Sequence, residues 1–326
     1  MNILVLVHSP FDMWNIPSAH VDRLRRDFPL HTFLHAHNDE EGMRLIREAD
    51  AAFSSQIHRE HLMAATRLRW IHSPAAGVGG MLYPEMVASP VVLTNSRGLS
   101  ADTIAEHVVG MALALFRHLT VAVQRQVERR WAQDEIGRLG NRTIAGSHVL
   151  IVGLGAIGSA AACRFAALGA KVTGIRRRQD AGLPEGVSAV ARPDRLRELL
   201  LSADVVVIAA PQTRETRYLF GAQEFAAMRS DALLVNVSRG KLVDEAALAS
   251  ALASGVIGGA ALDVFEHEPL DPGSPLWSLP NVLITPHTSG YRRDHWDAAT
   301  VLFEENLRRF EAGEPLLNVV DKESGY

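Results

Sequence analysis

The sequence predicts an α/β fold with two domains, each built around a parallel sheet. The chain has 326 residues, which is more than a single hydrophobic core usually holds. Short apolar runs alternate with helix-like segments along most of its length, a rhythm typical of parallel sheets flanked by helices. A glycine-rich turn, GLGAIG at 153–158, follows an apolar run in mid-chain. It marks the start of a second α/β series.

Composition and charge argue against several classes of protein. Hydrophobic residues make up 47% of the chain and the formal net charge is -4, so no nucleic-acid partner is indicated. The single cysteine, Cys163, cannot form an internal disulfide and fits a reducing compartment. MNILVLV lacks the basic region of a signal peptide, and no apolar stretch approaches the roughly 20 residues that span a bilayer. We therefore expect a soluble, cytoplasmic protein that does not bind membranes.

The first 99 residues predict a small α/β domain. Helix-like segments are expected at 18–27 and 40–50, between apolar runs of strand character. Those runs are ILVLV (3–7), LHTFLHA (30–36), AAF (51–53), LRWIHS (68–73) and VVLTN (91–95). From Ser100 the chain is apolar on nearly every side until Leu119, which predicts a buried helix between two domains that extends to about residue 126.

A second strand series follows, and its near-continuous apolar runs suit a parallel sheet covered on both faces. The runs are HVLIV (148–152), KVTGI (171–175), DVVVIAA (204–210), ALLVN (232–236), GGAALDV (258–264) and VLITP (282–286). Apolar residues at helical spacing in 294–312 predict a last helix that returns the chain to the first domain. We thus expect one domain from 1–99 and 291–326, and another from 100–290.

The glycine turn predicts a dinucleotide-binding Rossmann domain. Gly153 permits a tight turn, Gly155 lets the backbone approach a pyrophosphate, and Gly158 lets helix and strand pack closely. Backbone N–H groups and the positive end of the helix dipole then hold the phosphates. At the end of the next strand, where an NAD site usually has an acid, this chain has Arg176, Arg177 and Arg178. Guanidinium groups there suit a 2′-phosphate, so NADP is expected in preference to NAD, which stays possible.

Three later strands each end in a polar or charged group. Their segments are LLVNVSRGKLVDEAAL (233–248), ALDVFEHEPL (261–270) and ITPHTSG (284–290). Because ligands bind beyond the carboxyl ends of strands in open parallel sheets, Arg239, Glu268 and His287 should face one crevice around a nicotinamide.

The whole set of motifs resembles the D-isomer-specific 2-hydroxyacid dehydrogenases, nearly from end to end. The motifs are AAGVGG (75–80), AEHVVG (105–110), the glycine turn, NVSRG (236–240), DVFEHEP (263–269), TPHTSG (285–290) and EPLLNVVD (314–321). The arginines and EPLDPGSPLW (268–277) are most similar to NADPH-linked glyoxylate/hydroxypyruvate reductases. The resemblance implies a smaller, flavodoxin-like substrate domain beside the Rossmann domain.

The family's catalytic roles carry over to three residues. Arg239 matches the arginine that grips the keto acid's carboxylate and carbonyl, and His287 matches the general acid that protonates the carbonyl oxygen. Glu268 matches the carboxylate that orients His287 and favours its charged form. The chemistry implied is reduction of a small 2-keto acid to the D-2-hydroxy acid, by a protein that is commonly a homodimer.

Binding roles carry over as well. The backbone N–H groups of Ala76, Gly77 and Val78 match the loop that receives the substrate carboxylate from the other domain. Asp263 matches the residue that contacts the nicotinamide end of the cofactor. Further cofactor contacts are expected from Ala156, Ile157, Pro211 and Thr216.

Other features admit two interpretations. Tyr291, Arg292 and Arg293 either shape the pocket or begin a solvated helix, and Trp14 either closes over substrate or packs as a core aromatic. HREH (58–61) and HAH (35–37) lack a second ligand cluster at zinc-like spacing, so we expect no metal site.

Other functions of the same fold remain open. A phosphite dehydrogenase would keep a similar Arg, Glu and His set, and a dinucleotide-sensing corepressor would bind partners without turnover. Glu268 argues against a formate dehydrogenase, which would have glutamine there.

Overall fold

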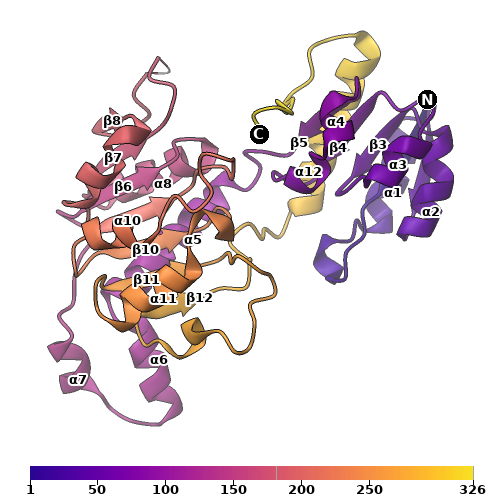
Figure 1. Ribbon diagram of the computed structural model, residues 1–326. Helices are drawn as coiled ribbons and strands as arrows, with labels where there is room; N and C mark the ends of the chain where they lie inside the picture. Colours follow the sequence, from indigo (N-terminus) through magenta and orange to yellow (C-terminus); the bar gives the residue numbers. More distant parts are fainter. Residues whose placement is uncertain (181, 326) are drawn as a thin grey trace. The chain divides into compact units, whose positions relative to one another are not determined.

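The computed structural model describes residues 1–180 and 182–325 and divides into two compact units (Figure 1). Unit 1 comprises Met1–Leu99 and Arg292–Tyr326, and unit 2 comprises Ser100–Tyr291. Tyr291 therefore groups with unit 2, one residue beyond the expected boundary. The substrate-binding and dinucleotide-binding roles of the two units stay predictions at this point.

Unit 1 contains a five-stranded parallel sheet in the order β2-β1-β3-β4-β5. This is the flavodoxin-like order that was expected. The strands are β1 (Asn2–Leu6), β2 (Thr32–Ala36), β3 (Ala51–Ser54), β4 (Trp70–Ser73) and β5 (Val92–Asn95).

Both faces of this sheet are covered, because successive side chains of a strand point to opposite sides. Ile3 and Val5 join a core with α1 (Ser18–Asp27) and α12 (His295–Ala312). Leu4 and Leu6 join the opposite core, into which the segments around α2 (Asp39–Leu45), α3 (Arg59–Ala64) and α4 (Pro84–Ala88) also pack. The returning segment 292–326 is thus part of the core of unit 1.

Unit 2 contains a seven-stranded parallel sheet in the order β12-β11-β10-β9-β6-β7-β8. The order reverses direction between β6 and β9, as in a Rossmann fold, and ligands of such sheets bind beyond the carboxyl ends of the strands. The strands are β6 (His148–Val152), β7 (Lys171–Ile175), β8 (Ala189–Ala191), β9 (Val205–Ile208), β10 (Leu233–Asn236), β11 (Gly259–Leu262) and β12 (Val282–Ile284). The predicted α/β fold is confirmed.

Helices again cover both faces. Buried residues of α5 (Ala101–Phe116) and α8 (Ala156–Ala167) form one core with the sheet. On the other face lie α9 (Leu196–Leu200), α10 (Ala222–Ala227) and α11 (Glu245–Ala253). The short edge strand β8 has no strong apolar run and was not predicted.

The expected helix from residue 100 to about 126 is in fact two helices. His118 adopts a left-handed backbone (φ 51°), which ends α5, and α6 (Leu119–Val127) then starts in a direction bent by 70°. None of the residues of α6 is buried. Together with α7 (Gln133–Arg138), α6 projects away from the sheet of unit 2 (Figure 1). Only α5 is therefore the buried helix that was predicted.

The described helices differ from a membrane span in length or in apolar character. None is by itself long and apolar enough to cross a bilayer, and one pair, α5 and α6, meets the length and composition criteria only when taken together across its bend.

Candidate active site

The turn between β6 and α8 has the shape that its glycines predict. Gly153 has φ 104°, a conformation that side chains rarely allow, and a Cβ on Gly158 would collide with the backbone oxygen of Gly153. A Cβ on Gly155 would meet nothing within 4 Å. Gly155 thus opens onto free space at the N-terminus of α8, where Ala156 and Ile157 form the first turn. Backbone N–H groups at such a terminus suit a phosphate.

Basic residues follow β7 directly. The side chain of Arg176 donates to the carbonyl oxygen of Gly182, which tethers it to the adjacent loop. A hydrogen bond from Thr213, with the charges of Arg177 and Arg214, keeps the pKa of Glu215 below its ordinary value. Arg177 therefore lies near the loop that follows β9, so positive charge from two strand ends gathers here.

That loop after β9 is held by its own side chains. Thr216 donates its hydroxyl to the Pro211 carbonyl at 2.7 Å and accepts from the Thr213 N–H, also at 2.7 Å. Pro211 and Thr216 are thus brought together as one compact turn.

Arg239 follows β10 and is exposed. Its Nη1 donates to the carbonyl oxygen of Ser238 at 2.6 Å, and its own carbonyl accepts from the Asn236 amide at 3.2 Å. Desolvation by the surrounding protein lowers the pKa of Arg239, although the nearby Glu268 carboxylate opposes this. The guanidinium nevertheless stays charged at any ordinary pH, so a cation stands at this strand end.

Glu268 and His287 form an ion pair after β11 and β12. His287 Nδ1 lies 2.6 Å from Glu268 Oε2, and Glu268 Oε1 accepts from the Phe265 N–H at 3.0 Å. Burial raises the pKa of Glu268, but the bonds from His287 and Phe265, with the charge of Arg239, outweigh it and leave the pKa below its ordinary value. Glu268 is therefore an ionised partner for the imidazole.

Asp263 fixes the turn that carries His287. The Asp263 side chain is fully buried, and its carboxylate accepts from the Thr285 hydroxyl (2.6 Å), the Thr288 N–H (2.8 Å) and the Ser289 N–H (3.1 Å). Its carbonyl oxygen accepts from the His287 N–H at 2.9 Å. These bonds hold His287 in a left-handed conformation with φ 54°.

The strands β10, β11 and β12 are neighbours in the sheet. Their carboxyl ends therefore bring Arg239, Glu268 and His287 to one edge of unit 2. A fixed guanidinium beside an imidazole–carboxylate pair can bind a carboxylate and transfer a proton.

The loop after β4 in unit 1 offers backbone donors. Ala76 and Gly77 are exposed, while Val78 is buried and anchors the loop. The Asn95 amide donates to the Ala76 carbonyl at 2.7 Å. Within the described chain no hydrogen bond uses the N–H groups of residues 76–78, so they are available to an anion.

Other predicted candidates have structural contacts in unit 1. Trp14 contacts the ring of His295 edge-on, with centroids 5.1 Å apart. Arg292 donates to the Leu99 carbonyl and forms an ion pair with Asp294. Arg292 thus links the end of the first segment of unit 1, residues 1–99, to the start of its returning segment. Among residues 1–180 and 182–325, no group of three or more His, Cys, Asp or Glu could hold a metal ion.

Comparison with known proteins agrees with this geometry. Residues 109–289 match the family model of the D-isomer specific 2-hydroxyacid dehydrogenase, NAD binding domain. The glyoxylate reductase of Korarchaeum cryptofilum is 33% identical over 285 residues, which cover 85% of this chain and 84% of that protein.

The chain belongs to the D-isomer-specific 2-hydroxyacid dehydrogenase family. It is thus an NAD(P)-dependent oxidoreductase of 2-keto and 2-hydroxy acids.

Solved structures of the family share this fold. A D-isomer specific 2-hydroxyacid dehydrogenase from Xanthobacter autotrophicus, in complex with NADPH and MES, superposes with a TM-score of 0.85 at 32% identity, covering 100% of this chain and 99% of that one. The NADPH-dependent glyoxylate/hydroxypyruvate reductase of Sinorhizobium meliloti, in complex with NADP and sulfate, gives 0.84 at 29% identity, covering 100% of both chains.

Sequence reasoning missed the contacts that support the turn carrying His287 in this dehydrogenase. His107 of α5 lies 3.1 Å from the Thr285 hydroxyl and 3.9 Å from Asp263, and neither His107 nor Thr285 was singled out. The AEHVVG and TPHTSG motifs contain both residues. Their pairing depends on α5 packing against β11, which no local pattern reveals.

Proposed function

We propose that this enzyme reduces a small 2-keto acid of the glyoxylate or hydroxypyruvate type to the D-2-hydroxy acid, with NADPH as the preferred cofactor. The observation that carries the proposal is the 2.6 Å ion pair between His287 and Glu268 on the same sheet edge as the Arg239 guanidinium. The names of the glyoxylate reductase relatives support the substrate class.

The residues of unit 2 fit a dinucleotide. The open space at Gly155 and the N-terminus of α8 suit a pyrophosphate, and the arginines after β7 suit the additional phosphate of NADP. The NADP and NADPH complexes of family members support this choice. When bound, the reduced nicotinamide supplies the hydride.

Arg239 and His287 would then divide the work on the substrate. The Arg239 fork binds the substrate carboxylate and polarises the keto oxygen. Because Glu268 holds Nδ1 of His287, Nε2 is left to donate the proton that the carbonyl oxygen takes up as its carbon receives the hydride. In the reverse direction His287 accepts that proton. The free N–H groups of Ala76, Gly77 and Val78 in unit 1 are proposed to receive the substrate carboxylate.

A cofactor and substrate panel tests this proposal. Oxidation of NADPH and NADH is followed by absorbance with glyoxylate, hydroxypyruvate, pyruvate, a branched keto acid and phenylpyruvate. We expect rapid turnover of glyoxylate or hydroxypyruvate with NADPH, and a shift of the cofactor preference toward NADH in Arg176→Asp. An unchanged preference in that variant would refute the 2′-phosphate assignment. Silence across the panel despite tight cofactor binding would refute the reaction.

We propose a homodimer in solution, formed through the segment 119–139. Helix α5 is buried within unit 2, so its apolar residues are not available to a partner. The segment 119–139 instead exposes several large apolar side chains. These are Leu119, Val123, Val127, Trp131 and Leu139. Light scattering should give twice the chain mass, and Val127→Asp should lower it to the mass of one chain.

A further inference from the structure

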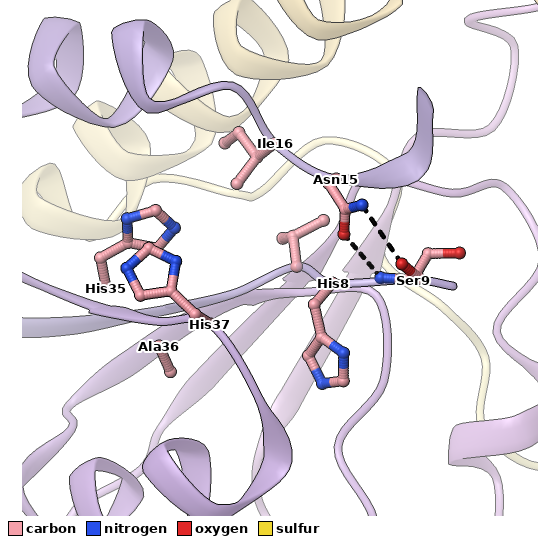
Figure 2. A pocket seen from close by; sticks show the side chains of 8 residues that line it. His8, Ser9, Asn15, Ile16, His35, Ala36 and His37 are labelled. Atoms are coloured by element: carbon pink, nitrogen blue, oxygen red, sulfur yellow. Dashed lines mark hydrogen bonds between the residues drawn. The ribbon is translucent and has the colours of Figure 1, made fainter. Parts of the chain in front are cut away.

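A cavity opens at the carboxyl ends of β1 and β2 in unit 1. It has a volume of about 340 Å³, at the small end of the range for ligand sites. Its lining is Val7, His8, Ser9, Asn15, Ile16, His35, Ala36 and His37 (Figure 2). The Asn15 side chain accepts from the Ser9 N–H at 2.7 Å and donates to the Ser9 carbonyl at 3.2 Å, which pins the loop after β1.

Two histidines at the carboxyl end of β2 line this cavity. Phe33 of β2 points into the core formed with α1 and α12, and Leu34 points to the other core. His35 follows Phe33 at a spacing of two and belongs to the same face of β2, and His37 lies one residue beyond the end of that strand. Their ring centroids are 4.1 Å apart with an interplanar angle of 52°, and Figure 2 shows the two rings side by side.

These rings have unused nitrogen atoms. Within residues 1–180 and 182–325, no hydrogen bond engages a ring nitrogen of His35 or His37. Ring nitrogens without a hydrogen-bond partner are the atoms through which imidazoles coordinate metals.

The charges around the pair favour a cation over an anion. Glu41 accepts from the backbone N–H of His37 at 2.9 Å, and Asp39 lies 3.2 Å from Nε2 of His8 on the cavity wall. With Asp22, these carboxylates outnumber the one guanidinium that acts on His35, that of Arg25. An anion would meet net negative charge here.

We propose that His35 and His37 bind one divalent transition-metal ion of the Cu²⁺, Ni²⁺ or Zn²⁺ type. Imidazole suits these ions, and metal–nitrogen distances of about 2.0–2.1 Å allow two rings this close to share one ion. Since no third residue of the described chain completes a cage, water fills the other positions, which open into the cavity. The site is independent of the proposed reaction.

Metal titration of the full-length protein tests the site. After treatment with a chelator, the wild type and the variants His35→Gln and His37→Gln are titrated with NiCl₂ by calorimetry. The control is His118→Gln, which removes an imidazole of unit 2 outside this cavity. We expect one site per chain in the wild type and in the control, weakened by about tenfold or more in each pair variant.

Copper spectroscopy separates this site from adventitious binding to the chain's other histidines. Electron paramagnetic resonance of the Cu²⁺-loaded wild type should show coupling to two imidazole nitrogens, and His37→Gln should retain one. His37 is exposed, so this variant is expected to fold even if His35→Gln does not. Absence of binding in the wild type, or equal affinity in the pair variants and the control, would overturn the proposal.

Discussion

Two parallel sheets of this enzyme each carry histidine at their carboxyl ends, yet the partners of these histidines differ. In unit 2, His287 lies 2.6 Å from an ionised carboxylate, Glu268, and its turn is fixed by the buried Asp263. In unit 1, His35 lies beside another imidazole, that of His37, with ring centroids 4.1 Å apart. In both units the histidine is positioned by the carboxyl end of a strand in a parallel sheet.

The difference shows that the partner, more than the fold, sets the chemistry of a histidine. A carboxylate fixes one ring nitrogen and compensates the charge that the ring gains when it is protonated. A second imidazole and partial burial disfavour that charge and leave lone pairs free. The first arrangement suits proton transfer and the second suits metal coordination.

The largest expected difference in activity between the two sites comes from removing His287. We expect His287→Ala to lower kcat by about 10²–10⁴-fold, the usual contribution of a general acid, with cofactor binding retained. His35→Ala should leave kcat within about twofold, since metal coordination at His35 is not part of the proposed reaction. Steady-state kinetics with NADPH and a fluorescence titration of the cofactor measure both. Similar losses in the two variants would contradict the distinction between the sites.

Asp263→Asn should cause the next largest loss of activity, because it weakens the hydrogen bonds that hold the turn of His287. The amide group cannot accept from all of the Thr285, Thr288 and Ser289 donors, and a buried donor left unpaired costs about 1–3 kcal/mol. We expect kcat to fall by about 10–100-fold with a smaller change in KM. The control Thr285→Val, which removes one donor to the same carboxylate, should lose less. A change confined to KM would favour direct contact of Asp263 with a ligand instead.

Glu268→Gln should have a moderate effect that depends on pH. It keeps a hydrogen-bonding group near His287 and removes the charge, so we expect kcat to fall by about tenfold. The pKa of Glu268 is lower in the folded protein than its ordinary value. Its ionised form therefore adds stability above the ordinary pKa of a glutamate, and that contribution is lost as the pH falls through the lowered value.

Urea unfolding of the wild type and of Glu268→Gln at several pH values measures the contribution of the ionised Glu268 to stability. The midpoints should differ at pH 7 and converge in acid. A difference that grows in acid would reverse the assigned direction of the pKa shift.

Patterns of short range predicted much of this molecule. The apolar runs predicted the strands because both sheets are buried on two faces. The glycine spacing predicted the turn at 153–158 because Gly153 and Gly158 each meet a steric demand there. The strand ends indicated that Glu268 and His287 would meet, and the ion pair is present. Their catalytic roles stay predictions.

Features that depend on one dihedral angle or on distant packing were not predicted. The end of α5 rests on the left-handed backbone of His118, and the apolar pattern continues across it unchanged. The role of Asp263 rests on the folding of residues 285–289 over a buried carboxylate. The nearness of the rings of His35 and His37 depends on their rotamers, which spacing alone does not fix.

The smallest expected effect concerns His8, the third histidine of the unit 1 cavity. Its pair with Asp39 is 3.2 Å long, but half of the Asp39 side chain is exposed, with a relative accessibility of 49%. Exposed pairs of this kind contribute about 0–1 kcal/mol, because water and salt screen them. His8→Ala should therefore barely move the urea midpoint at high salt. It should also leave nickel binding unchanged, because His8 is not a ligand in the proposed site. Loss of nickel affinity in His8→Ala would show that the metal site includes His8 and is not formed by His35 and His37 alone. The comparison of the two sheet edges would then lose its contrast between a histidine paired with a carboxylate and a histidine paired with another imidazole.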